Sequence, residues 1–322
     1  MTNFPGGIQG SPVIGANHFG WKHKSAHASR VWVVDGISGS DGAEGDSPDS
    51  ALRTVGRAIF LASAYDVIYV LDKGLSGTDP NPYREAIANL SIAYAKNNLA
   101  LIGVPHNIHE LYGLQIKAAL VLTTPILSVS APFTVIENLD FNGTGDALAR
   151  GNIYFADDGD TINQAQGSSV YNCHLRNGKG SAGVATMGGG IVIHGGWHYI
   201  VKGCRFDRCR CGIWMSSKGA TIQNNRIEDN LFTTSDLAVV DKDIHMATAA
   251  ESTVIARNYF AHDIGSYGSN LYATLTGSGG LLNNYFAHAA VEAKAAGADI
   301  VIPATFRMAG NFDEAGIIVR AS

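Results

Sequence analysis

The stretch Ile136-Glu137-Asn138-Leu139-Asp140-Phe141 carries the pattern that decides the fold: an aliphatic residue, two spacers, a residue that is small or an amide in the other copies, one spacer and a large apolar residue. The pattern recurs with the members Val170, Cys173 and Leu175; Val201, Cys204 and Phe206; Ile222, Asn225 and Ile227; Ile255, Asn258 and Phe260; Leu281, Asn284 and Phe286. The first members lie 34, 31, 21, 33 and 26 residues apart. Periods of ~20–50 residues are typical of stacked repeats, and alternating positions are typical of strands. Since each copy is too short to bury its own apolar face, the copies are predicted to stack as a β-solenoid.

Composition agrees with this interpretation and excludes several classes of function. The chain has 322 residues, of which 38 are glycines and 16% are charged, which suits many tight turns and a polar, weakly charged surface. A net charge of -5 favours no nucleic acid partner. No apolar run approaches ~18 residues, so no membrane span is expected. The start, Met1 to Gly7, lacks a charged region followed by an apolar one, so no signal peptide is expected.

The N-terminal part divides into two predicted units ahead of the solenoid. Residues 1–30 form an arm with no apolar period, and its scattered Phe4, Pro5, Phe19 and Trp21 are expected to order only by docking on another surface. Residues 31–64 hold a first strand at 31–34 and a helix that covers the open end of the coils. Residues 65–322 form the solenoid itself.

The capping helix is predicted from its start signals and its apolar stripe. Ser47 is a suitable N-cap and Pro48 fits the first helical position. One face of about four turns then carries Leu52, Val55, Ile59 and Ala62. Further strands are predicted at residues 67–71, 86–87, 90–92, 99–104, 120–122, 126–129 and 317–319.

The segment VWVVDGISGSDGAEGDSPDSALRTVGRAI at residues 31–59, followed by DVIYVLDKG, YREAIANLSI and LALIGV, resembles the opening of right-handed parallel β-helix proteins of the pectin-lyase-like superfamily. The resemblance covers roughly residues 31–290. It implies an all-β, single right-handed parallel β-helix with an N-terminal capping helix, but no particular chemistry, because enzymes, adhesins and viral spikes share this fold. The start TNFPGG at residues 2–7 also resembles uncharacterised bacteriophage virion proteins.

Four cysteines, Cys173, Cys204, Cys209 and Cys211, have a spacing that matches no familiar zinc pattern. Cys173 and Cys204 hold the same place in the repeat, so they are expected to stack ~4.8 Å apart on successive coils. Buried free thiols are the favoured interpretation, with a disulfide or a bound metal as the alternatives.

Outward columns of the repeat supply the candidates for chemistry. One predicted column contains Asp207 and Glu228 on adjacent coils, at a spacing near the ~5–5.5 Å between the carboxyl groups of retaining glycosidases. The alternative is that Arg176, Arg205 and Arg226 neutralise these acids. Polygalacturonases of this fold carry four motifs, of which only Asp157-Asp158 and part of a Gly-His-Gly motif, at His194-Gly195-Gly196, are present. We therefore assign no catalytic residue.

Three further columns have a structural and a functional interpretation. Tyr259 and Tyr285, in twin phrases, point outward as a packing ladder or as a contact for a glycan or a second subunit. Asn225, Asn258 and Asn284 are predicted to form an inward amide ladder. Two further groups are weak metal candidates: the pair His262 and His288, and the acidic loop with Asp41, Glu44, Asp46 and Asp49. No metal and no cofactor are therefore expected.

These observations predict a structural, non-enzymatic bacteriophage virion protein, either a capsid decoration or head spike or a tail-associated spike. The resemblance implies a homotrimer that binds other virion proteins through its arm and possesses a surface for host glycans. The protein would be made in the host cytoplasm and reside in the virion. The alternative is a tailspike-like polysaccharide hydrolase or lyase with Asp207 and Glu228 as its acids. A carbohydrate-binding module is a third interpretation.

Overall fold

The fold is taken from a computed structural model, which describes residues 30–72, 83–84, 90–105, 114–117, 125–143, 151–156, 165–178, 189–216, 222–234, 242–246, 250–262, 273–275, 277–287, 300–301 and 305–313. Strands dominate these ranges, and every pairing between them is parallel. The helices in them are the 3-10 turns η1 (Pro48–Ser50) and η2 (Tyr94–Lys96) and the α-helix α2 (Val55–Leu61). In this part of the chain no helix is long and apolar enough to cross a membrane.

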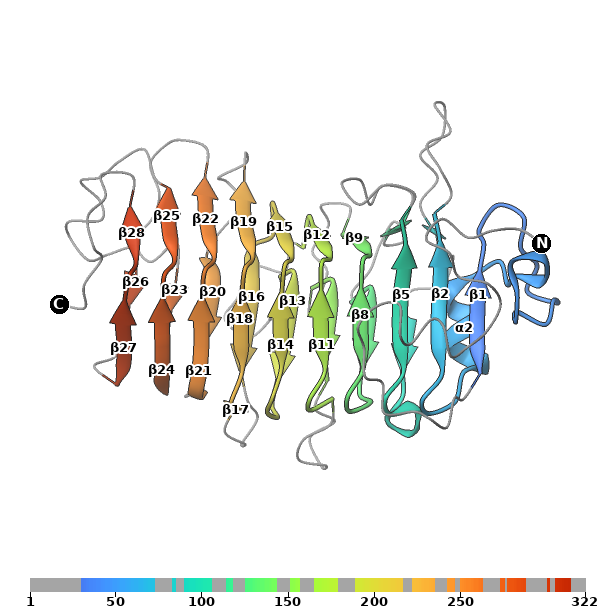
Figure 1. Cartoon of the computed structure of the whole chain (residues 1–322), viewed down its shortest axis with the longest axis horizontal. Coiled ribbons are helices and arrows are strands. Elements are labelled where there is room, and N and C mark those ends of the chain that lie inside the picture. Colours follow the sequence, from blue (N-terminus) through green and yellow to red (C-terminus); the bar gives the residue numbers. More distant parts are fainter. Residues whose placement is uncertain are drawn as a thin grey trace.

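The strands form three sheets that run along the molecule (Figure 1). Sheet A pairs, in order, β1 (Val31–Val34), β2 (Val67–Leu71), β5 (Ala100–Val104), β8 (Val135–Glu137), β11 (Ser169–Tyr171), β14 (Ile200–Lys202), β18 (Arg226–Glu228), β21 (Ala250–Ala256), β24 (Gly277–Leu282) and β27 (Phe306–Ala309), and β17 (Ile222–Gln223) also pairs with β21. Sheet B contains β3 (Tyr83–Arg84), β6 (Gln115–Lys117), β9 (Asp140–Asn142), β12 (His174–Arg176), β15 (Arg205–Asp207), β19 (Leu231–Thr234), β22 (Tyr259–His262), β25 (Tyr285–Ala287) and β28 (Phe312–Asp313). Sheet C contains β4 (Leu90–Ile92), β7 (Leu127–Val129), β10 (Ile153–Phe155), β13 (Ile191–His194), β16 (Cys211–Ser216), β20 (Lys242–Met246), β23 (Ala273–Thr274) and β26 (Ile300–Val301).

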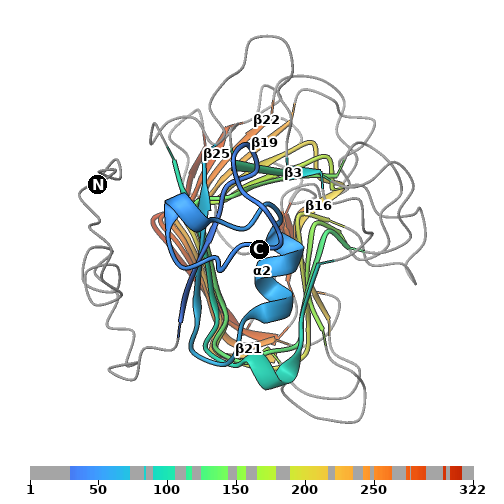
Figure 2. The same cartoon turned by 90° about the vertical axis from the view of Figure 1, so that its right-hand side faces the viewer.

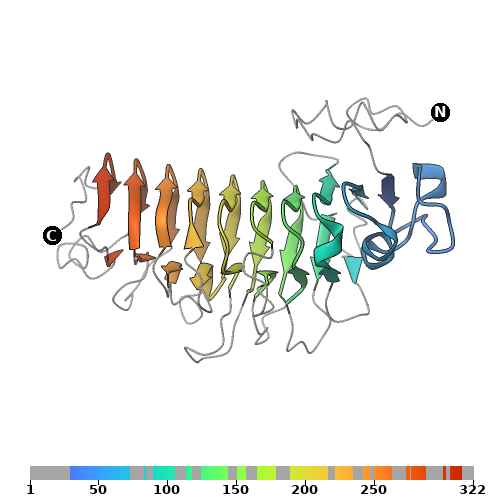
Figure 3. The same ribbon diagram turned by 90° about the horizontal axis from the view of Figure 1, so that it is seen from below.

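The chain visits the sheets in the order A, B, C and then returns to A one coil further on. Successive coils therefore stack along one long axis, as Figure 3 shows from below. The predicted all-β parallel solenoid is confirmed. Of the predicted strands, those near 67–71, 90–92, 99–104 and 126–129 are present, whereas 86–87, 120–122 and 317–319 lie outside the described residues.

The repeated phrase corresponds to the corner between sheets A and B. Its third position has a left-handed backbone in each coil: Asn138, Asn172, Gly203, Asp229, Arg257, Asn283 and Gly310. Residues of this conformation carry a steric penalty unless they are Gly or, to a lesser degree, Asn or Asp. The bend turns the next residue inward and the one after it outward, so the phrase fixes both the corner and the facing of sheet B.

The fourth copy of the phrase is assigned wrongly by the sequence pattern. Ile227, rather than Ile222, pairs with Val201 on one side and with Ile255 on the other. The true copy is therefore Ile227, Asn230 and Phe232, which stacks on Phe206 and Phe260. The pattern fails because the corner that enters sheet A also contains a left-handed residue, here Asn224, followed by a small or amide residue.

Amides and rings form continuous ladders inside the coils. Asn230 Nδ2 donates to Asn258 Oδ1 at 3.0 Å, Asn258 Nδ2 to Asn284 Oδ1 at 3.0 Å, and Asn284 Nδ2 to Asn311 Oδ1 at 3.0 Å. The predicted amide ladder is thus confirmed for Asn258 and Asn284, but Asn230 replaces Asn225. Beside it, the rings of Phe206, Phe232, Phe260 and Phe286 stack with centroids 4.7, 4.9 and 4.8 Å apart.

The N-terminal end of the stack is covered by α2, which lies within the outline of the coils (Figure 2). It buries Val55, Ala58 and Ile59, and Thr54 caps it by accepting a hydrogen bond from the Arg57 amide at 3.1 Å. The helix is seven residues long rather than four turns. The predicted helix is too long because Leu52 is extended and forms a β-bridge with Val34. After the N-cap Ser47, only the 3-10 turn η1 forms.

Side-chain hydrogen bonds satisfy the acidic loop that precedes this helix. Asp41 Oδ1 accepts from the Arg53 and Thr54 amides at 3.0 and 2.9 Å, and its Oδ2 accepts from the Thr54 hydroxyl at 2.9 Å. Asp46 accepts from the Ser50 hydroxyl at 2.6 Å. Within the described ranges no group of three or more acidic, His or Cys residues has the geometry of a metal site. The loop is therefore explained as the connection that fixes α2.

Candidate binding surfaces

The outward face of sheet B carries an aromatic strip near its C-terminal end. Tyr259 and Tyr285 are paired in register, and their rings stack with centroids 4.7 Å apart and planes 15° apart. Leu231 precedes them and Phe312 follows in the same column. Tyr259 and Phe312 are 43% and 44% exposed, respectively. The predicted stack of Tyr259 and Tyr285 thus exists, and it belongs to a longer apolar strip that faces solvent.

The acid pair that the sequence suggested is separated between two sheets. Asp207 lies in β15 of sheet B, opposite Thr233, whereas Glu228 lies in β18 of sheet A, between Lys202 and Ala256. The interpretation that placed them on adjacent coils depended on the wrong fourth copy of the phrase. They are not a carboxyl pair across one glycosidic bond.

Arginines neutralise several acids on the lateral faces. Glu228 is buried and forms ion pairs with Arg226 at 2.8 Å and with Arg257 at 3.1 Å. Asp140 is buried as well, and its Oδ1 accepts a hydrogen bond from Nε of Arg176 at 3.0 Å, with a second contact from the same guanidinium to Oδ2. The Arg257 guanidinium holds the pKa of Asp229 below its ordinary value. These carboxylates are engaged by arginines, which suits a static surface more than general acid catalysis.

His174 lies in the outward column of sheet B between Asp140 and Arg205. Burial, together with the charges of Arg176, Arg205 and Arg208, lowers its pKa to about 3. This imidazole is therefore neutral at physiological pH. A neutral, half-buried ring between charged neighbours serves as packing in this column, and it has no positive charge with which to hold an anion.

Sheet C presents a second outward column, which the sequence interpretation missed. Tyr154, Val192, Trp214 and His245 are paired in register on β10, β13, β16 and β20. Each follows an isoleucine and precedes a second inward apolar residue, in the triplets Ile153-Tyr154-Phe155, Ile191-Val192-Ile193, Ile213-Trp214-Met215 and Ile244-His245-Met246. That recurring triplet is the signal that could have located the column.

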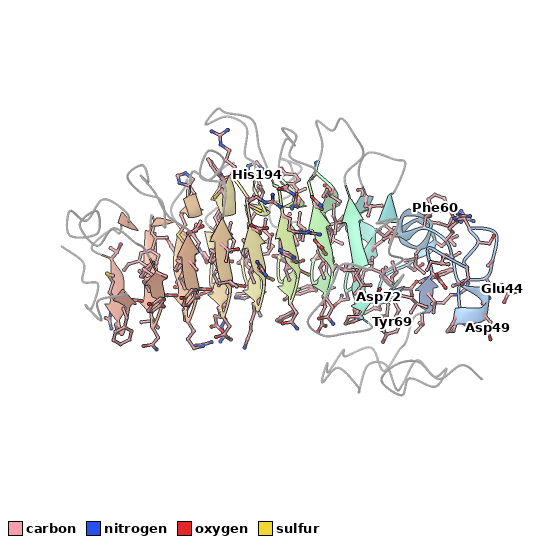
Figure 4. The ribbon with its side chains drawn as sticks, turned by 90° about the horizontal axis from the view of Figure 1, so that it is seen from above. Glu44, Asp49, Phe60, Tyr69, Asp72 and His194 are labelled. Carbon is pink, nitrogen blue, oxygen red and sulfur yellow. The ribbon has the colours of Figure 1, made fainter. Side chains whose placement is uncertain are left out.

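Polar atoms accompany the rings of this column. The hydroxyl of Tyr154 and Nδ1 of His194 lie 2.9 Å apart and share a hydrogen bond. The rings of Trp214 and His245 are 4.3 Å apart at 50°. Figure 4 shows His194 on the side of the stack opposite Tyr69 of sheet A. Tyr154 and Val192 are buried, whereas Trp214, His245 and His194 are partly exposed. Partly exposed aromatic faces beside hydrogen-bonding groups are suited to pyranose rings, which have apolar faces and polar rims.

The four cysteines are buried and free. Burial raises the pKa of Cys204 and of Cys209 to about 12, and it raises the pKa of Cys173 well above its ordinary value. Since the thiolate is the reactive form, these side chains are inert core residues. The predicted buried thiols are confirmed.

Several predicted residues fall outside the described part of the chain. These are the arm residues Phe4, Pro5, Phe19 and Trp21, the pair Asp157-Asp158, and His288. The roles assigned to the arm and the boundaries at 30 and 64 remain predictions.

Comparison with known proteins agrees with the geometry. The family described as right handed beta helix region matches residues 134–293. A lacto-N-biosidase of family GH136 from Eubacterium ramulus is similar in structure, with a TM-score of 0.50 and 13% identity over 80% of this chain, and the chain spans 56% of that protein. The chain thus has the right-handed parallel β-helix fold.

Two other solved structures are similar at lower scores. A pectin methylesterase from Aspergillus niger gives a TM-score of 0.48 and 13% identity, over 89% of this chain and 83% of that one. ORF18 of Geobacillus virus E2 gives 0.37 and 12% identity, over 82% of this chain and 62% of that one. No curated protein matches the sequence at a significant level. At these identities the likeness concerns the fold alone.

Proposed function

We propose that the chain is a structural, non-enzymatic protein of a bacteriophage particle, a decoration or spike of the head or a spike associated with the tail. In this role the β-helix is a rigid rod. The stacked amides and phenylalanines link each coil to the next, so bending the rod would break buried hydrogen bonds. The start of the sequence, which resembles phage virion proteins, supports the assignment to a particle.

The observation that carries the proposal is the aromatic strip of Tyr259, Tyr285 and Phe312, with Leu231 beside it, in which Tyr259 and Phe312 are exposed and the other two are partly buried. Large apolar side chains that gather at the surface mark contact surfaces. Tyrosine is enriched in such contacts because it offers a large area and a hydroxyl at little entropic cost. The strip serves as a lateral contact with sister subunits or with a host glycan.

The proposed assembly is a homotrimer, anchored to other virion proteins by the arm with Phe4, Pro5, Phe19 and Trp21. Three-fold symmetry turns the same face of each subunit toward the rotation axis, so three copies of the strip meet there.

Light scattering on the purified protein tests the trimer, and mass analysis of intact particles tests the role in the particle. The expected result is a mass about three times 33.9 kDa and recovery of the protein with purified particles. A monomer would contradict the trimer while leaving the particle role standing. Absence of the protein from intact particles would contradict the role itself.

The column on sheet C favours a second candidate, a tailspike-like hydrolase or lyase that acts on a polysaccharide. Tyr154 and His194 share a hydrogen bond there and Trp214 packs beside His245. Incubation with host capsule or lipopolysaccharide, followed by an assay for new reducing or unsaturated ends, tests it. Product that His194→Ala abolishes, with Ala261→Ser as the control that retains it, would establish this second function and contradict the first.

A further inference from the structure

Sheet A has an apolar outward face at its N-terminal end, distinct from the core inside the coils. Strand alternation turns Ile68, Leu101 and Ile136 inward, so their neighbours point outward. The outward set forms a separate cluster of Tyr69, Ala100, Ile102, Val104 and Val135, packed against Val31, Val67, Leu71 and Tyr171. At ~4.8 Å between strands and ~3.3 Å per residue, this outer patch is roughly 15 Å across.

The outer patch is shielded from water although it faces away from the core. Ala100, Ile102 and Val135 are 0%, 5% and 6% exposed. Val254 and Leu282, which face outward on β21 and β24 of the same sheet, are only partly buried. Apart from the small Ala256, the outward side chains of this sheet are thus more completely shielded at the N-terminal end than at the C-terminal end.

Glu137 lies within the outer patch, between Ile102 and Tyr171. Its carboxylate is buried, and its Oε2 has no hydrogen-bond partner in the described part of the protein. Burial raises the pKa of Glu137 to about 7, and burial together with the Glu137 charge raises the pKa of Tyr69 to about 12. Burial is the largest cause of both shifts. A buried carboxylate in such a place disfavours a cover that carries negative charge.

The N-terminal segment, residues 1–29, begins its path at the edge of this patch. The Arg30 amide donates to Asp66 Oδ1 at 2.7 Å, and the Arg30 carbonyl accepts from the Val67 amide at 3.1 Å. The segment therefore joins the body beside Val31 and Val67. Twenty-nine residues reach up to ~100 Å when extended, several times the width of the patch.

The composition of the segment complements the patch. It offers the apolar residues Phe4, Ile8, Val13, Ile14, Phe19 and Trp21. It has the cations Lys22 and Lys24 and no Asp or Glu. An apolar segment that has cations and no acidic residue suits a face that combines aliphatic side chains with one carboxylate.

We propose that residues 1–29 lie against the outer patch of their own chain, with apolar side chains over Tyr69, Ile102 and Val135. This arrangement goes beyond the role in a particle and holds whether or not that role is correct. It places the N-terminal segment on the body of the free protein, so that any partner that binds the segment competes with the patch.

Photocrosslinking within the full chain tests the proposal. Benzoylphenylalanine replaces Tyr69, and it replaces Tyr259 as a control far along the stack. Crosslinks are mapped by mass spectrometry in a mixture of ¹⁴N- and ¹⁵N-labelled protein, which separates contacts within a chain from contacts between chains. We expect the probe at position 69 to capture peptides of residues 1–29 of the same chain and the probe at 259 to capture none of them. Capture of another segment, or of a second copy, overturns the proposal.

Limited proteolysis gives an independent measure. On this proposal the segment is bound to the outer patch in the native protein, so trypsin cleaves after Lys22 and Lys24 only in those molecules whose segment has detached. Ile102→Asp places a charged side chain under the segment. Because position 102 faces outward, the coils themselves should tolerate this change. We expect cleavage at these lysines to become at least tenfold faster. Leu282→Asp, in the same outward column at the other end, should leave the rate unchanged. Equal rates in the native protein and in Ile102→Asp contradict the proposal.

Discussion

At the scale of single residues, two buried carboxylates show how differently the fold treats charge. Asp66 accepts three hydrogen bonds, from the Arg30 amide at 2.7 Å, the Trp32 indole at 2.8 Å and the Ser63 amide at 2.8 Å. It thereby joins the first strand to the end of the capping helix. Glu137 lies under a cover with one oxygen unpaired among the described residues. The first carboxylate stabilises the fold, whereas the second costs free energy when ionised.

Removal of the Asp66 carboxylate should destabilise the N-terminal end. In Asp66→Ala the three donors lose their acceptor, which costs about 2–4 kcal/mol of unfolding free energy since bonds to a charged group are the stronger kind. Urea denaturation followed by circular dichroism measures the loss. Glu251→Ala, an exposed acid on the same sheet, is the control and should change the free energy by less than about 0.5 kcal/mol.

The raised pKa of Glu137 predicts a pH dependence of stability with a definite sign. Folding shifts this pKa from 4.5 to about 7, so the folded protein binds the proton more tightly. The cost is full above pH 7, decreases as the pH falls from 7 to 4.5, and vanishes below that range. Glu137→Gln should therefore be more stable than the native protein at pH 8, by up to about 3 kcal/mol, and equal to it at pH 4. Urea titrations at pH 8, 6 and 4 measure this. A difference that grows toward low pH would be inconsistent with a buried carboxylate.

At the scale of the elements, the repeat could be predicted because one corner imposes the same demands in each coil. A residue with a left-handed backbone, such as Asn138 or Asn283, is followed by an inward residue and an outward one. This order gives a sequence pattern that can be recognised. The sequence could not separate this corner from the one that enters sheet A, because Asn224 meets the same demand there. Only the pairing of Ile227 with Val201 and Ile255 distinguishes them. The column of Trp214 and His245 was missed because a strand triplet with a variable middle residue gives a weak signal.

The amide ladder should contribute strongly to stability through its inner members. In Asn258→Ala the amide and side chain of Asn230 lose their acceptor, and the Ile227 carbonyl loses its donor. Buried groups left unpaired cost about 1–3 kcal/mol each, so a loss of about 3 kcal/mol or more is expected. Gln223→Ala, on the outer surface, is the matched amide control. Thermal and urea unfolding compare the two, and similar small losses in both would mean that the ladder does not restrain the coils.

At the scale of the whole molecule, the stack presents different surfaces along its length: a cap and a shielded apolar patch at the N-terminal end, and an aromatic strip toward the C-terminal end. The fold was predictable because every coil repeats the same arrangement of strands and corners. The candidate surfaces were predictable only where, as with Tyr259 and Tyr285, the phrase itself placed them. Columns that depended on the register of the fourth copy were not.

The aromatic strip predicts a separation between stability and assembly. Tyr259→Ser combined with Tyr285→Ser removes side chains that face solvent, so the fold should persist. Assembly, or binding to a host glycan, should weaken about tenfold or more, as expected for tyrosines central to a contact. Ala261→Ser with Ala287→Ser, in the neighbouring column of the same strands, should leave both unchanged. Sedimentation and glycan-binding assays provide the readout, and an unaltered assembly and affinity would remove the strip from the account.

The register of the coils is the claim on which all these surfaces depend, and an experimental density map of the isolated protein at about 3 Å tests it most directly. The account predicts parallel coils ~4.8 Å apart, with Asn230, Asn258, Asn284 and Asn311 in one inward column and Tyr259, Tyr285 and Phe312 in one outward column. A map that shows antiparallel hairpins, or an inward column that passes through Asn225 in place of Asn230, would contradict it.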